Sequence, residues 1–295
     1  MSDSDLIAAT NRTSGAPLMR IIHPSDFSAA SRIAFTHALK IALHAQAELE
    51  IVHVQRHRVG NVSDVDWTDF PEVRATLTRW KVVPAGAGAE EVAKCGLQVR
   101  KILSAEHDPL ESLITYCEKY PPDLLVLATH QREGFSRWLH KPVAEPLARR
   151  AHAMTLFVPT HGSGFIEPAT GASNLRRILI PVDHRPNAQA ALEECYFLAT
   201  GLNSQTVQFR LLHMGTEKGF PTLYLPHHPG WKWDTRLMAG DPVESILKEA
   251  ADWSPQLIVM ATEGHRDFLD ALRGSTTERV LRAADCAVLA VPATS

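Results

Sequence analysis

The stretch that decides the fold is RILIPVDHRPNAQAALEECYFLA, residues 177–199. It begins with a short aliphatic run, passes through a proline and an aspartate, and then carries apolar residues at helical spacing. A strand that leads through a polar turn into a helix is the first half of a βαβ unit. The same pattern stands earlier in the chain as RIIHPSDFSAASRIAFTHALKIA, residues 20–42. The chain therefore contains an internal repeat.

Further blocks recur in the same order in both halves of the chain. Their order and spacing make chance similarity a poor explanation, and a duplicated domain accounts for all of them. The matching blocks are IVHV (51–54) with LLHM (211–214), HDPLESLI (107–114) with GDPVESIL (240–247), and residues 122–159 with 255–292, which align without a gap.

Two copies fit a chain of 295 residues, since one domain commonly takes about 100–200 residues. We expect the first domain at 17–160, the second at 175–295, and a linker rich in Gly, Ser, Thr and Pro at 161–174. Strands that alternate with helices predict an α/β fold in which each copy has a mostly parallel five-stranded sheet flanked by helices. Strands are expected near 19–24, 50–54, 97–103, 124–128 and 154–158, and again near 177–181, 207–213, 235–238, 257–261 and 287–291.

The copies differ most between their second and third strands. The first copy has a long insert there, 55–94, with helical stretches, and the second has a shorter one, 215–232, with several aromatic and histidine residues. The shorter insert fits either an ordered lid or a segment packed against the other copy. Of the two, packing against the other copy is the interpretation we favour.

Composition and missing motifs narrow the function. A net charge of −3, from 30 basic and 33 acidic residues, argues against a nucleic-acid partner. No apolar run is long enough to span a bilayer, and the N-terminus lacks a signal-peptide pattern, which predicts a cytoplasmic protein. The four cysteines contain no CxxC spacing, so we expect free thiols and no zinc cluster. Without HExxH, GxSxG or GxxxxGK[ST], we expect neither a metal site nor a hydrolase or P-loop mechanism.

The segment ATEGHRDFLDALRGSTTERVL, residues 261–281, carries the most chemistry. Gly264 allows the chain to turn after a buried strand, and Gly274, Ser275 and Thr276 open the last helix. A helix N-terminus offers unpaired backbone N–H groups and a partial positive charge, which suit a phosphate. From the spacing alone, an ordinary helix cap fits as well.

These blocks together resemble the universal stress protein family, from Met19 to Pro292. The resemblance implies two tandem Rossmann-like domains of the HUP type whose last strands pair, so that one chain forms its own pseudo-dimer. Family resemblance also implies a stress-response protein that binds ATP, with Mg²⁺, and signals to protein partners instead of catalysing, with at most slow ATP hydrolysis. Whether chains pair further as a homodimer is left open.

The nucleotide motif of the family carries over residue by residue onto the second copy. ATP-binding members have a glycine, two residues, a glycine, nine residues, and then Gly-Ser or Gly-Thr. Ala261 stands at the first glycine, while Gly264 and the Gly274–Ser275 pair match the rest, and Thr276 adds a hydroxyl. The resemblance then implies that Asp183 helps to hold the nucleoside.

The first copy departs much further from this motif. Its four positions hold Ala128, Gln131, Lys141 and Pro142, and the proline removes a backbone donor where a phosphate would need one. We expect this copy to be degenerate for ATP and to act as a built-in partner of the second. The alternative function is a dimeric interaction scaffold that binds no nucleotide, which Ala261 and the degenerate first copy favour.

Overall fold

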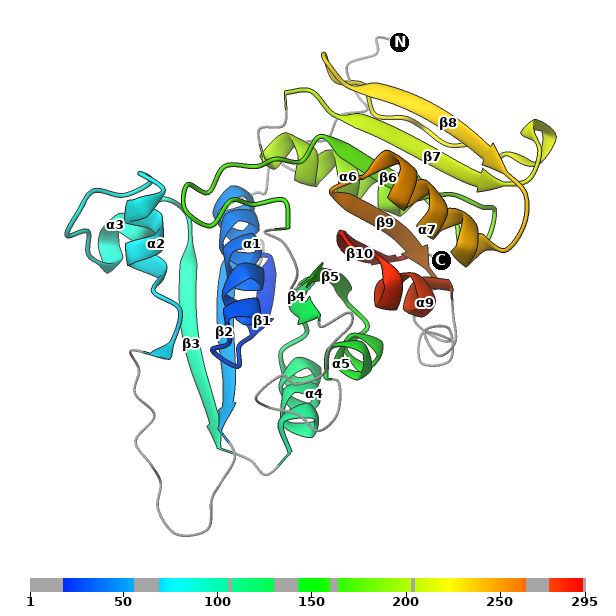
Figure 1. Ribbon diagram of the computed structural model, residues 1–295. Coiled ribbons are helices and arrows are strands. Elements are labelled where there is room, and N and C mark those ends of the chain that lie inside the picture. The colour runs from blue at the N-terminus through cyan, green and yellow to red at the C-terminus, as the bar shows by residue number, and fades with distance from the viewer. Residues whose placement is uncertain are drawn as a thin grey trace, which may run out of the picture.

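The computed structural model describes residues 18–55, 69–105, 108–129, 143–159, 164–202, 205–263 and 276–293. Its strands form one sheet in the order β3-β2-β1-β4-β5-β10-β9-β6-β7-β8 (Figure 1). The first repeat contains β1 (Arg20–Pro24), α1 (Ala29–Ala45), β2 (Glu48–Gln55), α2 (Val73–Arg79), α3 (Ala89–Lys94), β3 (Gln98–Ala105), α4 (Pro109–Lys119), β4 (Leu124–Thr129), α5 (Ala144–Ala151) and β5 (Met154–Pro159). The second contains β6 (Arg177–Pro181), α6 (Gln189–Gly201), β7 (Gln208–Met214), the 3-10 turn η2 (Glu217–Gly219), β8 (Lys232–Met238), α7 (Pro242–Trp253), β9 (Leu257–Thr262), α9 (Thr276–Ala283) and β10 (Ala287–Pro292).

The strand order of the second repeat mirrors that of the first, and the two halves meet at β5 and β10. These two strands are antiparallel, with Leu156 opposite Leu289, whereas the other neighbouring strands of the sheet are parallel. Leu156 and Leu289 are equivalent residues of the two repeats, so a pseudo-two-fold axis passes between them. The predicted α/β fold, with a mostly parallel sheet and paired last strands, is confirmed.

Local sequence explains where the helices after β3 and β8 begin. Asp108 accepts hydrogen bonds from the backbone N–H groups of Leu110 (2.8 Å) and Glu111 (3.3 Å), and Pro109 follows it at the first helical position. In the second repeat Asp241 accepts from the N–H of Glu244 at 3.0 Å. An aspartate N-cap followed by proline is a favoured helix start, because the side chain satisfies an N–H that the helix leaves unpaired.

The third strand of the second repeat is longer than the sequence predicts. It begins at Lys232, three residues before the expected start at Thr235. Five of the seven residues of β8 are exposed and only Trp233 and Met238 are half-buried, so alternation between exposed polar and buried apolar residues does not extend along the strand. Without that alternation, an exposed edge strand gives only a weak periodic signal.

Each face of the sheet carries one apolar core that runs through both repeats. Helices α1 and α6 cover one face, and α4, α5, α7 and α9 cover the other (Figure 1). The repeats also touch through helices on both faces. The rings of His44 in α1 and Phe197 in α6 lie 5.1 Å apart, and Arg282 of α9 donates to Glu145 of α5 at 3.0 and 3.2 Å. The pseudo-dimer is thus held by three layers, not by the strand pair alone.

The described part of the linker, residues 164–174, is packed onto the first repeat. Phe165 and Ile166 are fully buried, and their backbone N–H groups donate to Nε2 of His37 in α1 at 3.0 and 3.3 Å. Further along, Nε1 of Trp80 donates to the carbonyl oxygen of Pro168 at 3.0 Å. The helices of the 55–94 insert therefore help to hold the linker in place.

Gly171→Ala is expected to destabilise the protein more than Gly86→Ala. Both glycines have positive φ, +68° and +80°, which costs an L-residue roughly 1–2 kcal/mol. A Cβ at Gly171 would also overlap the Trp80 ring, whereas one at Gly86 would meet no heavy atom within 4 Å. Urea denaturation of both variants measures the difference. Equal losses would contradict a tight contact between the linker and Trp80.

Candidate functional site

The site predicted from the sequence lies at the carboxyl edge of the sheet in the second repeat. In a parallel sheet, this edge is where loops leave the strands and where the following helices begin. The edge comprises the ends of β6, β7 and β9 and the first turns of α7 and α9. Of the predicted residues, Asp183, Ala261 and Thr276 are described by the structure, while Gly264, Gly274 and Ser275 lie outside the described residues.

Asp183 lies just beyond β6 and is exposed. Its Oδ1 accepts the backbone N–H of His184 at 2.7 Å, and it forms an isolated bridge with Asn187. The ring of His184 makes a separate contact, with Nε2 3.1 Å from the carbonyl oxygen of Gly219. Both side chains thus bond to backbone groups that shape the loop, so the adjacent pair is not arranged as an acid–base dyad. An exposed carboxylate at this edge is available to a ligand's hydroxyl groups.

Ala261 and Thr276 stand on either side of the connection between β9 and α9. Ala261 is partly buried near the end of β9, where its methyl group packs against the core shared with α6. The next residue, Thr262, is buried and donates to the carbonyl oxygen of Val291 at 3.3 Å. Thr276 is the first residue of α9. The strand end and the helix start that flank the phosphate motif therefore both lie at the predicted edge.

An ion pair links the first turns of the two helices at this edge. Nη1 of Arg279 in α9 lies 3.5 Å from Oδ2 of Asp241, the N-cap of α7. The backbone N–H of Glu244, with Arg279 as a further contribution, holds the pKa of Asp241 below its usual range. Asp241 therefore stays charged at neutral pH, and the neighbouring arginine offsets its charge near the start of α9.

The insert between β7 and β8 packs on its own repeat, which overturns the packing against the other copy that we favoured from the sequence. Phe220 meets the buried His213 of β7 at 5.6 Å between ring centroids. The Trp231 ring lies against Phe209 of β7 at 5.0 Å, and Gln189 of α6 bonds to both backbone groups of Tyr224. The aromatic residues of the insert thus complete the core beside β7 and α6.

At the equivalent edge of the first repeat, aromatic rings pack together beyond the end of β1 and beside the end of β2. Phe27, which follows Asp26, adopts a left-handed φ of +61° and stacks on His53 at 3.9 Å and 11°. Phe70 of the long insert packs edge-on against Phe27 at 5.0 Å. The pKa of His53 is lowered by burial, which fits a neutral ring within this stack.

Of the four degenerate motif positions of the first repeat, the structure describes one. Ala128 lies near the end of β4, whereas Gln131, Lys141 and Pro142 lie outside the described residues.

Some residues that shape or support the candidate site have no clear signature in the sequence. The left-handed backbone of Phe27 could not be predicted from the sequence, because a positive φ is uncommon for phenylalanine. The buried ion pair of Arg210 with Glu249 was detectable in principle. In the alignment of IVHV with LLHM, the residue just before each block is Glu50 in the first repeat and Arg210 in the second. Equivalent strand positions thus carry opposite charges, which indicates that each residue pairs with a partner of the charge opposite to its own.

Residues that could hold a metal do not gather in the part of the chain that the structure describes, where no group of three or more His, Cys, Asp or Glu side chains has metal-binding geometry. Two histidines of the second repeat make other contacts: His213 bonds to the carbonyl oxygen of Val182, and the His228 ring stacks on Trp231 at 4.6 Å. Among the described helices, none combines the length and the apolar content that a membrane span requires.

The fold defines a tandem α/β protein with a Rossmann-like strand order, and the candidate site lies at the carboxyl edge of its second repeat. The model of the universal stress protein family matches residues 17–159 and 222–292. The chain belongs to the universal stress protein family.

Individual relatives agree with this assignment. A universal stress protein of Methanocaldococcus jannaschii is 28% identical over 141 residues, which is 47% of this chain and 81% of the relative. A universal stress protein from Archaeoglobus fulgidus has a similar structure, with a TM-score of 0.57, 18% identity, and coverage of 93% of this chain and 98% of the other. A putative universal stress protein from Pseudomonas aeruginosa has a TM-score of 0.55 and 16% identity, and covers 93% of both chains. At these identities the two structures establish the shared tandem fold.

Proposed function

We propose that this universal stress protein binds an adenine nucleotide, ATP with Mg²⁺, at the carboxyl edge of its second repeat and signals the bound state to protein partners in the cytoplasm. Asp183 would contact the nucleoside, and Gly264 together with Gly274, Ser275 and Thr276 would hold the phosphates. The observation that carries the proposal is the contrast between the repeats. Asp183 is exposed in the second repeat, whereas its counterpart in the first, Asp26, is half-buried and is followed by Phe27, which stacks on His53.

The contacts of Asp183 and His184 support a binding role over a catalytic one. Asp183 and His184 are both engaged with backbone groups of the loop, so neither is held as a general base for an attacking water. Any ATP hydrolysis is therefore expected to be slow. Nucleotide binding would instead change the surface around the insert, since His184 bonds to Gly219 of that segment.

Millimolar ATP with Mg²⁺ is expected to raise the midpoint of thermal unfolding. At about a hundredfold excess over Kd, a ligand selective for the folded state adds about 2.7 kcal/mol. The Gly274→Val/Ser275→Val variant should lose the shift, because bulky side chains would block the helix start, while Lys141→Ala in the first repeat should keep it. AMP and inorganic phosphate separate the nucleoside contribution from the phosphate contribution. A shift that survives in the double variant would contradict the site.

A second candidate function is an interaction scaffold that binds no nucleotide. It is favoured by the methyl group of Ala261, which stands at the first glycine of the motif and packs against the core. Ala261→Gly separates the two functions. If the methyl group closes the site, the wild type shows no shift with ATP and Ala261→Gly gains one. If the wild type already shifts, the scaffold function is ruled out as the sole role.

A further inference from the structure

The strand β8 forms an open edge of the sheet. It stands last in the strand order, next to β7, and five of its seven residues are exposed. Figure 1 shows it as a long outer strand with no described helix beyond it. An unpaired edge presents a row of backbone donors and acceptors to which another strand can add. Edge strands are commonly protected by being short or covered, but β8 has seven residues and no described element pairs with its outer edge.

The backbone groups that point away from β7 can be identified. The N–H of Lys232 donates to the carbonyl oxygen of Val207 at 2.9 Å, and the carbonyl oxygen of Met238 accepts from the N–H of Gly215 at 2.9 Å. Even-numbered residues of β8 therefore direct their backbone groups inward. Because this direction alternates along a strand, Trp233, Thr235 and Leu237 direct theirs outward.

We propose that a second copy of this chain adds to β8 as an antiparallel strand, related by a two-fold axis at Thr235. In this register, Thr235 faces Thr235 of the partner subunit and Trp233 faces the partner's Leu237, so the outward backbone groups of the two strands bond to one another. Such an interface is isologous: each strand offers the other the same surface. The sheets of the two chains would join into one.

Side-chain charges favour this register. Asp234 faces Arg236 of the partner subunit on one face of the ribbon, and the symmetry repeats this pair. The two side chains are 57% and 60% exposed. Within the chain they contact Arg210 at 2.7 Å and Glu249 at 3.7 Å. Directly opposed pairs of opposite charge stabilise an antiparallel ribbon, and like charges destabilise it.

Registers displaced by one residue do not fit the backbone direction, and they also place Asp234 or Arg236 opposite its own copy. The backbone also allows a register centred on Trp233, which places Asp234 opposite Lys232 of the partner subunit but leaves Arg236 without a charged residue opposite it. The register centred on Thr235 brings both Asp234 and Arg236 into pairs of opposite charge, so it gains more from charge than its neighbours do.

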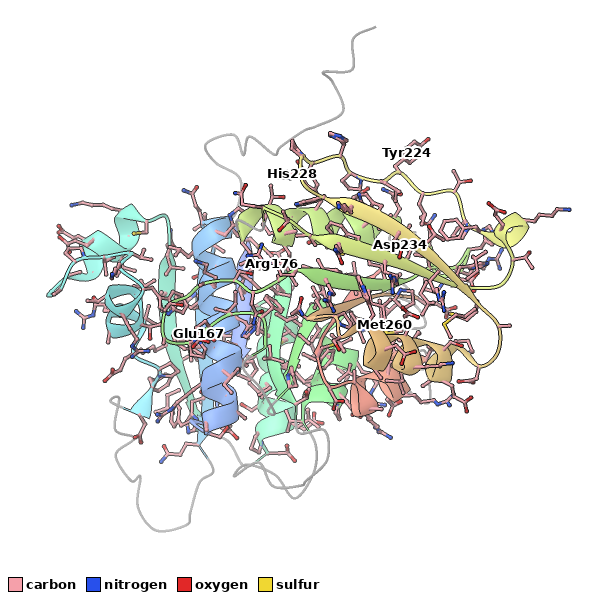
Figure 2. All side chains as sticks on the ribbon, turned by 45° about the horizontal axis from the view of Figure 1, so that its top comes forward. Glu167, Arg176, Tyr224, His228, Asp234 and Met260 are labelled. Carbon is pink, nitrogen blue, oxygen red and sulfur yellow. The ribbon has the colours of Figure 1, made fainter. Side chains whose placement is uncertain are left out.

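The opposite face of the ribbon is apolar. Trp233 would lie against Leu237 of the partner subunit, and Leu237 is 40% exposed in the single chain. The insert that runs beside this face is anchored to β8 because Nε1 of Trp233 donates to the carbonyl oxygen of Pro226 at 3.1 Å. It carries Tyr224 and Leu225, which are 80% and 44% exposed; Figure 2 shows Tyr224 projecting from the molecule on the side of β8, with Asp234 on the strand itself. A second copy would cover part of this apolar surface.

Sedimentation of the full chain over micromolar to high micromolar concentrations tests the proposal through charge complementation. Asp234→Lys and Arg236→Glu each create two like-charge pairs in the homodimer, so each alone should weaken association by at least about tenfold. Mixed together, one chain carries two positive residues and the other two negative ones, and association should return to within about threefold of the wild type. Arg150→Glu on α5, an exposed charge reversal away from β8, is the control and should associate like the wild type.

A backbone variant keeps the test decisive if a charge variant folds poorly. Thr235→Pro removes an outward N–H but no hydrogen bond to β7, so the fold should persist, as circular dichroism can check, while association is lost. A wild type that stays monomeric at all concentrations would overturn the proposal. So would a dimer that is insensitive to Thr235→Pro, or one whose charge variants fail to recover on mixing although each is folded.

Discussion

Replacing Arg210 by methionine is expected to lower the free energy of unfolding by about 3 kcal/mol, because it leaves a buried carboxylate without its main partner. Nη1 of Arg210 donates to Glu249 at 2.6 Å, and the Glu249 side chain is only 6% exposed. Among the described residues, the cation that would remain beside Glu249 is Arg236, whose Nε lies 3.7 Å away and whose side chain is 60% exposed. Methionine keeps much of the aliphatic volume next to Trp253, over which the guanidinium stacks at 4.4 Å.

The matched control removes both members of the pair. Arg210→Met/Glu249→Leu should cost less than the sum of the two single substitutions, since no buried charge is then left unpaired. Urea denaturation of the four proteins gives this coupling directly. Single losses that simply add would mean that the pair contributes through packing and not through charge.

The first repeat holds the opposite charges at the equivalent positions. Glu50 stands where the second repeat has Arg210, and its fully buried side chain accepts from Arg100 at 3.1 Å and from the hydroxyl of Tyr116 at 2.9 Å. Burial and the Glu50 contact raise the pKa of Tyr116 well above its usual range, so its hydroxyl remains a donor. Glu50 therefore needs the cation Arg100, and Arg210 needs the anion Glu249. Placing the residue of one repeat at the equivalent position of the other would bury two like charges next to each other.

Much of the fold was predictable because its signals are local or repeated. The strands β4 and β9 are continuous apolar runs, and the N-caps Asp108 and Asp241 recur in matching blocks. Aligning the two halves of the sequence reveals these strands and N-caps without a structure. The pairing of β5 with β10 was implied by family resemblance, and the structure confirms it.

The features that escaped prediction depend on contacts between distant residues. Nothing local marks Phe27 as a ring that stacks on His53, since the stack requires a positive φ at one strand end and a neighbouring strand to receive it. The same holds for the insert, whose Trp231 could have met either repeat until its contacts with Phe209 and Tyr196 were known. For the proposed nucleotide site, the sequence supplies the candidate phosphate motif, and the structure adds the positions of Asp183, Ala261 and Thr276.

Acidification is expected to weaken the attachment of the linker to α1 through His37. This histidine is fully buried and neutral: Nδ1 donates to the carbonyl oxygen of Ile33 at 2.9 Å, which leaves Nε2 to accept the N–H groups of Phe165 and Ile166. Protonation would put a hydrogen on Nε2 and remove that acceptor. Burial lowers the pKa of His37 from 6.5 to about 4.

The sign of the pH dependence follows from this lowered pKa. Below pH 6.5 the unfolded chain takes up a proton at His37 that the folded chain does not bind until about pH 4, so stability falls across that window as the pH decreases. One such group costs up to about 1.4 kcal/mol per pH unit, or about 3 kcal/mol over the window. His23, also fully buried with a pKa lowered to about 4, should add a loss of the same sign.

His37→Gln isolates the contribution of the linker contact, because its amide oxygen can accept the two N–H groups but does not titrate. Between about pH 7 and pH 5 the wild type should lose about 2 kcal/mol more than this variant in urea denaturation. His184→Gln, a substitution of an exposed histidine, is the control and should keep the wild-type dependence. Hydrogen exchange should show the amides of Phe165 and Ile166 losing protection on acidification in the wild type and not in His37→Gln. An unchanged pH dependence in His37→Gln would mean that the linker is held by packing on Phe165, independently of the histidine's charge.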